Sequence, residues 1–74
     1  MTGNMKSMLT SLLAALQQTR AGQNLVKLSY HNDRTGEWVE IVEKTDDGGV
    51  RTRDINVTAN SGAAIILAVV KEVI

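Results

Sequence analysis

Few side chains in this sequence could act as acids, bases or nucleophiles, and the most suggestive pair is His31 with Asp33. A histidine beside a carboxylate can move a proton, but residues 32–36 have the composition of a turn. Catalysis needs such groups inside a cleft, and the tip of a hairpin has no walls. Glu40 and Glu43 are an odd number of positions apart, so in a strand they point to opposite faces. We therefore expect no catalytic residues and no enzymatic activity.

Metal-binding and phosphate-binding motifs are also missing. The sequence contains no cysteine, which removes disulfides, thiolate zinc sites and thiol nucleophiles together. One histidine cannot by itself assemble a metal site of the usual kind. The Gly48-Gly49 pair lacks the flanking pattern and the lysine of a phosphate-binding loop. We expect neither a metal ion nor a cofactor.

Trp38, the only tryptophan, is the most informative candidate for binding. The strand register derived below places it beside His31, on the sheet face that carries polar residues. A tryptophan on such a face offers a partner a large, rigid contact area, although a single exposed apolar residue needs no functional explanation. The sequence predicts a partner-binding surface made of Trp38, His31, Lys27 and Arg53.

The charge balance bears on which partner this would be. Eight Lys and Arg residues balance eight Asp and Glu residues, whereas domains that bind phosphate backbones usually carry a basic excess. This balance disfavours nucleic acid as a partner and favours an unidentified protein. The alternative is a module for single-stranded nucleic acid that uses the sheet as a platform. Its stacking groups would be Trp38, Tyr30 and His31, and its phosphate contacts Lys27, Arg51 and Arg53.

The elements that must position these residues can be derived from hydrophobic spacing. Apolar residues recur every three or four positions from 5 to 16, which predicts a helix. Alternating segments at 26–31, 37–44 and 50–57, separated by turns, predict three antiparallel strands. A register that faces Tyr30 with Val39 and Leu28 with Ile41 matches apolar residues on one face only. In the second hairpin Ile41 faces Arg53, a poor match that favours a bulge in the third strand.

The last segment, residues 63–74, has conflicting signals. Its β-branched residues favour a strand, but its length and the N-cap residue types before it, Thr58, Asn60 and Ser61, favour a helix. As a helix it is apolar around most of its circumference, more than one sheet can cover. We therefore predict a homodimer that buries the remainder, with candidate interface residues Ile65, Leu67, Val69 and Ile74.

Together these patterns predict an α+β fold of order α-β-β-β-α, with both helices on one face of a three-stranded meander. Residues 1–74 are short enough to form a single domain. No apolar stretch reaches the length of about 20 residues that spans a bilayer. No apolar block of signal-peptide type follows Lys6, so we expect a cytoplasmic location. The predicted function is a small, non-enzymatic protein-interaction domain.

Overall fold

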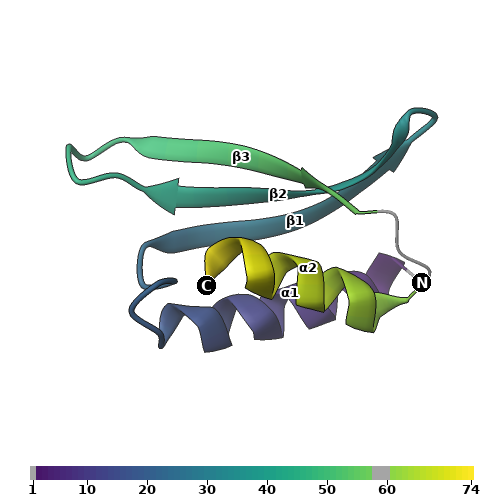
Figure 1. Cartoon of the computed structure of the whole chain (residues 1–74), viewed down its shortest axis with the longest axis horizontal. Helices are drawn as coiled ribbons and strands as arrows, with labels where there is room; N and C mark the ends of the chain where they lie inside the picture. Colours follow the sequence, from purple (N-terminus) through teal and green to yellow (C-terminus); the bar gives the residue numbers. More distant parts are fainter. Residues whose placement is uncertain (1, 58–60) are drawn as a thin grey trace.

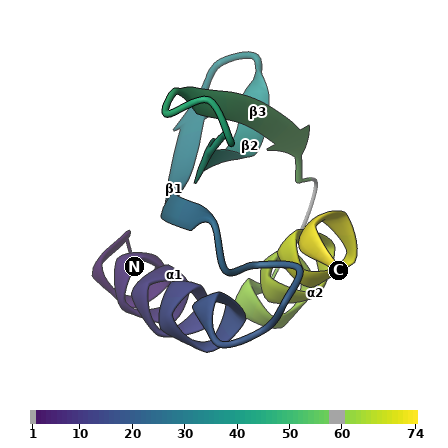
Figure 2. The same ribbon diagram turned by 90° about the vertical axis from the view of Figure 1, so that its left-hand side faces the viewer.

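The computed structural model describes residues 2–57 and 61–74, and it confirms the predicted α+β fold. One open antiparallel sheet in the order β1-β2-β3 lies over a layer of two helices (Figure 1). Seen along the layers, α1 lies below β1 and α2 lies on the β3 side (Figure 2). The elements are α1 (Thr2–Gln17), β1 (Leu25–Asp33), β2 (Gly36–Lys44), β3 (Val50–Asn56) and α2 (Gly62–Val73).

The register of the first hairpin agrees with the prediction. Tyr30 faces Val39, and His31 faces Trp38. The loop is tighter than the turn predicted at residues 32–36, because Asp33 and Gly36 themselves pair and leave two residues between them. Gly36 has a φ of 147°, a conformation that side chains disfavour, so glycine permits this turn.

The second hairpin also has the predicted register, but the bulge lies in a different strand. Ile41 faces Arg53 as expected, and the pairing runs without interruption from Trp38 to Lys44. The irregularity occurs instead in β1, between Leu25 and Lys27. Two buried leucines explain this position. Leu25 and Leu28 are three residues apart, and an extra residue in the strand lets both reach the same face.

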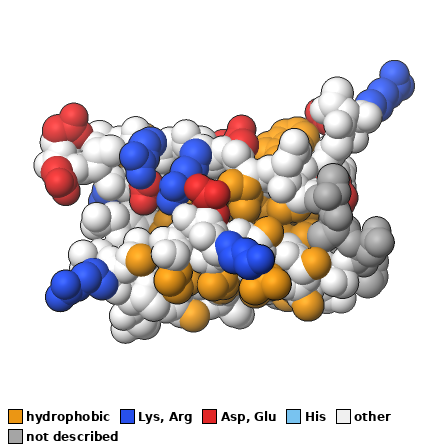
Figure 3. Space-filling view, in the orientation of Figure 1, with side chains coloured by type: hydrophobic (Ala, Val, Ile, Leu, Met, Phe, Trp, Pro, Cys, Tyr) orange, Lys and Arg blue, Asp and Glu red, His pale blue; other side chains and the backbone are white. Residues whose placement is uncertain are grey.

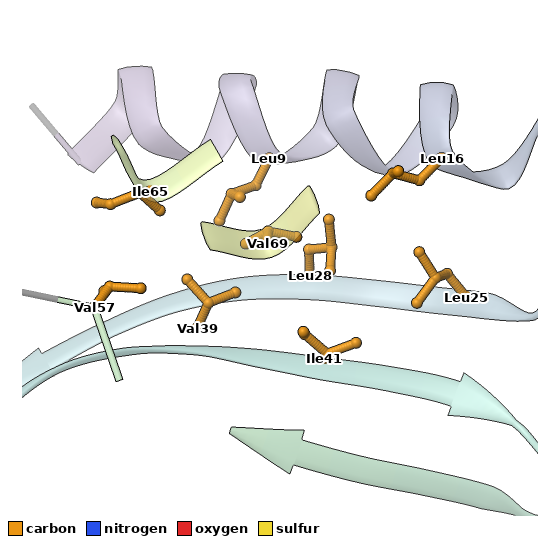
Figure 4. Packing of buried hydrophobic residues seen from close by; sticks show 9 residues of the cluster. All are labelled: Leu9, Leu16, Leu25, Leu28, Val39, Ile41, Val57, Ile65 and Val69. Carbon is orange, nitrogen blue, oxygen red and sulfur yellow. The ribbon is translucent and has the colours of Figure 1, made fainter. Parts of the chain in front are cut away.

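The core fills the space between the sheet and the helices, and every element takes part in it or adjoins it (Figure 4). The two β2 residues in it, Val39 and Ile41, have no exposed surface, because they lie on the central strand directly above the helices. The buried apolar residues are Leu9, Leu16, Leu25, Leu28, Val39, Ile41, Val57, Ile65 and Val69.

The C-terminal segment is a helix, which decides between the two readings of its sequence. Ser61 caps it, since its side-chain oxygen accepts a hydrogen bond from the Ala64 N–H at 3.3 Å. The other two expected cap residues, Thr58 and Asn60, lie outside the described residues. Burial of one apolar stripe against the sheet outweighs the low helix propensity of the β-branched residues.

Candidate interaction surfaces

His31 and Asp33 do not form an acid–base pair. The His31 ring stacks on Trp38, with ring centroids 5.4 Å apart and planes 18° from parallel. The Asp33 carboxylate turns into its own loop, where Oδ1 accepts from the Thr35 hydroxyl at 2.6 Å and from the Thr35 N–H at 2.7 Å. The hydroxyl bond, followed by the backbone bond, lowers the pKa of Asp33 below its usual 3.8. This carboxylate therefore stabilises a turn.

The strand carboxylates Glu40 and Glu43 lie on opposite faces, as their spacing predicts. Glu40 Oε1 is 3.6 Å from Lys27 Nζ and 3.7 Å from His31 Nε2 on the outer face. Glu43 lies on the helix side, where it forms an ion pair with Arg51. The two carboxylates contact different partners and cannot act on one substrate.

Three of the four predicted partner-binding residues do come together. Lys27, His31 and Trp38 occupy the face of the sheet that the helices leave uncovered, with Glu40 among them. Trp38 is only half-buried, and its stacked contact with His31 covers part of its ring. This surface combines one rigid aromatic pair with charges of both signs.

Arg53 does not belong to that surface, so its assignment there is wrong. Because it pairs with Ile41, its side chain lies on the helix side. There Nη1 donates to Glu72 Oε2 at 3.1 Å, and Nη2 is 3.8 Å from Glu43 Oε1. Its Nε is buried without a hydrogen-bond partner among the described residues. Arg53 thus connects α2 to the sheet.

The same register affects the nucleic-acid alternative. Tyr30 and Arg51 also point to the helix side, where the Tyr30 hydroxyl donates to Glu37 and Arg51 donates to Glu43. The groups proposed for stacking and phosphate contact are thereby divided between two faces. Of the three proposed phosphate contacts, only Lys27 lies on the same sheet face as Trp38.

The residues of α2 fall on two opposite faces, which corrects half of the predicted dimer interface. Ile65 and Val69 are 3% and 0% exposed, so they belong to the core of this chain and cannot contact a second copy. Leu67 and Ile74 are 55% and 70% exposed. Apolar side chains gather over α2 on the face that Figure 3 shows. The structure thus determines the phase of the helix, which the all-round apolar sequence left open.

A groove between α1 and the edge strand β1 was missed in the sequence. It has a volume of about 570 Å³ and is lined on the helix side by Met5, Lys6, Leu9, Thr10 and Leu13. Residues 26–31 of β1 form the other side. One sign of the groove was in the sequence, because the apolar stripe of the first helix is wider than one edge strand can cover. The position of the groove, however, depends on the placement of α1 under β1, which the sequence does not give.

Comparison of the chain with known protein families, curated protein sequences and solved structures gave no match. Among the described residues, no helix is long and apolar enough to cross a membrane. Within residues 2–57 and 61–74, no three His, Asp or Glu side chains are grouped as metal ligands would be.

Proposed function

We propose that this protein is a non-enzymatic interaction domain that forms a homodimer through the outer face of α2. The observation that carries the proposal is the spacing of the outward-facing apolar residues. They recur at intervals of four, three and four, which is the spacing at which helices pair along a narrow seam. This α2 seam consists of Ala63, Leu67, Val70 and Ile74.

The two uncovered faces of the molecule differ in chemistry, which supports the choice of the α2 seam. The outer sheet face carries Lys27, His31 and Glu40, whose charged and polar groups are suited to water. The α2 seam itself has no charged residue. Of the two charged residues of α2, Lys71 flanks the seam, and Glu72 lies on the opposite side, where it pairs with Arg53. An uncharged apolar seam is compatible with an identical seam, since a two-fold contact brings no like charges together.

The exposed area of the chain supports a second copy as the partner that covers the α2 seam. The chain exposes 5123 Å², whereas a compact monomer of 8.0 kDa is expected to expose roughly 4,450 Å². The excess of about 670 Å² is close to the roughly 800 Å² that each partner contributes to a standard interface. A dimer would offset the small core of a chain this short.

Light scattering coupled to gel filtration tests this proposal over a range of micromolar concentrations. We expect the wild type to have twice the 8.0 kDa mass of the chain. Leu67→Glu should give the monomer mass, because it places a charge in the centre of the α2 seam. Val50→Glu is the matched control, since Val50 is also exposed but lies on β3, and it should remain dimeric.

Two results would refute the dimer. One is a monomer mass for the wild type across the whole range. The other is a dimer that Val50→Glu disrupts and Leu67→Glu does not. The proposal also includes a cytoplasmic location, which fractionation of cells that express a tagged chain would test.

A further inference from the structure

The edge of β1 offers unpaired backbone groups beside the groove. The Val57 N–H donates to the Glu37 carbonyl at 3.1 Å, and this bond flanks the Trp38–Asn56 pair. Successive residues of a central strand direct their N–H and C=O groups to opposite neighbours. Because Glu37 bonds toward β3, the N–H and C=O of Trp38 point toward His31 on β1. Because bonded positions alternate along a strand, the N–H and C=O groups of Leu28 and Tyr30 point to the open edge.

The groove beneath this edge is apolar along its floor. Met5, Leu9 and Leu13 of α1 line it, and they span eight residues of helix, or about 12 Å. Alternate side chains of an extended strand are about 6.8 Å apart. The floor thus has room for two side chains of an added strand, at the positions opposite Leu28 and Tyr30.

The charges around the groove indicate what kind of strand fits. The lining includes Lys6, Lys27 and His31 but no carboxylate. A strand residue opposite Ser29 would point to the outer face, between Lys27 and His31. An acidic side chain there would share Lys27 with Glu40, which lies 3.6 Å from Lys27 Nζ on the β2 side. A second copy paired through its own β1 would instead bring the Lys27 ammonium groups of both chains to one seam, which like charge disfavours.

We propose that the groove between α1 and β1 binds an extended peptide of the pattern apolar–acidic–apolar, which adds to β1 as an antiparallel strand. Main-chain hydrogen bonds to Leu28 and Tyr30 would hold the peptide, and the groove would select its two apolar side chains. This site deepens the proposed interaction function by naming the chemistry of the partner. It is separate from the α2 seam, so the two proposals can fail independently.

The probe is a fluorescently labelled synthetic peptide, acetyl-SGTVEVTGS-amide, titrated against the full chain and followed by anisotropy. We expect saturable binding, with amide shifts in an NMR spectrum concentrated at residues 26–31. The monomeric Leu67→Glu variant should bind equally well, which separates this site from the dimer. Absence of binding at millimolar peptide, or shifts confined to α2, would overturn the proposal.

Backbone methylation of the peptide tests the strand geometry. An N-methyl group on either valine removes a bond to the β1 edge and should weaken binding about tenfold. An N-methyl group on the central glutamate is the matched control, because that N–H points away from β1, and binding should be retained. Equal losses from all three methylations would refute strand addition.

A charge exchange tests the predicted acidic position. Lys27→Glu should weaken binding of the glutamate peptide several-fold and improve binding of acetyl-SGTVKVTGS-amide. Lys44→Glu, on the same sheet face but outside the groove, is the control and should leave both affinities unchanged. If Lys27→Glu fails to reverse the preference between the two peptides, the assignment of the acidic residue is wrong.

Discussion

Replacing Val69 with alanine is the most direct test of how α2 is oriented. The Val69 side chain has no exposed surface, and it lies between α1 and the sheet (Figure 4). The substitution removes two methyl groups, worth about 1.6 kcal/mol of burial at about 0.8 kcal/mol each. Incomplete collapse of the cavity adds roughly 0.5–1 kcal/mol. We expect the free energy of unfolding to fall by about 2–2.5 kcal/mol.

Val50→Ala is the matched control, because it removes the same atoms from a side chain that is 66% exposed. Only about a third of the Val50 side chain is buried, so removing its two methyl groups should lower the free energy of unfolding by about 0.5 kcal/mol. In a domain of this size the difference corresponds to a melting temperature lower by roughly 6–16 °C for Val69→Ala than for Val50→Ala. Both variants keep the α2 seam intact, so any stabilisation by self-association is common to them.

Thermal and urea unfolding, followed by circular dichroism at several protein concentrations, would measure both variants. A melting temperature of Val69→Ala within a few degrees of that of Val50→Ala would refute this orientation of α2. That result would mean that α2 does not bury the stripe that contains Val69, and that the outward assignment of Leu67 is also wrong.

Three further outcomes follow from the structure. Arg53→Met should change the free energy of unfolding, measured in urea, by less than about 1 kcal/mol. The lost ion pair with Glu72 is partly exposed, and the substitution also removes the buried Nε that has no hydrogen-bond partner among the described residues. The carboxyl of Asp33 should titrate below 3.8 in NMR spectra, and Thr35→Val should raise its pKa. Since a lowered pKa favours the ionised form, the contribution of Asp33 to stability is present above about pH 4 and is lost as the pH falls through its folded pKa. Single-stranded oligonucleotides should show no salt-dependent binding, and micromolar binding that Trp38→Ala abolishes would instead favour the nucleic-acid module.

Strand pairing was the part of the fold that could be predicted in most detail. Tyr30, Leu28, Val39 and Ile41 belong to alternating segments next to short turns, so a register shift of one residue would have exposed all of them. Arg53 is the exception. The register that pairs it with Ile41 already places it on the helix side, yet its charge suggested an exposed surface.

The orientation of α2 could not be predicted, for a physical reason. A helix that is apolar all round has no polar face to mark the solvent side, so sequence spacing cannot distinguish Val69 from Leu67. The groove beside β1 was beyond reach for a related reason. It depends on how α1 and β1 are placed in space, a long-range arrangement that short-range periodicity does not describe.

The bulge at Val26 also limits how far a strand can extend along the edge of the sheet. An added chain can follow β1 through Tyr30 and Leu28, but beyond Leu28 the strand changes its twist and loses its regular spacing of donors and acceptors. A short peptide tolerates that interruption, whereas an extended partner strand loses pairing on one side of it. The same irregularity that lets Leu25 and Leu28 share the core should therefore discourage edge-to-edge aggregation while leaving room for a ligand a few residues long.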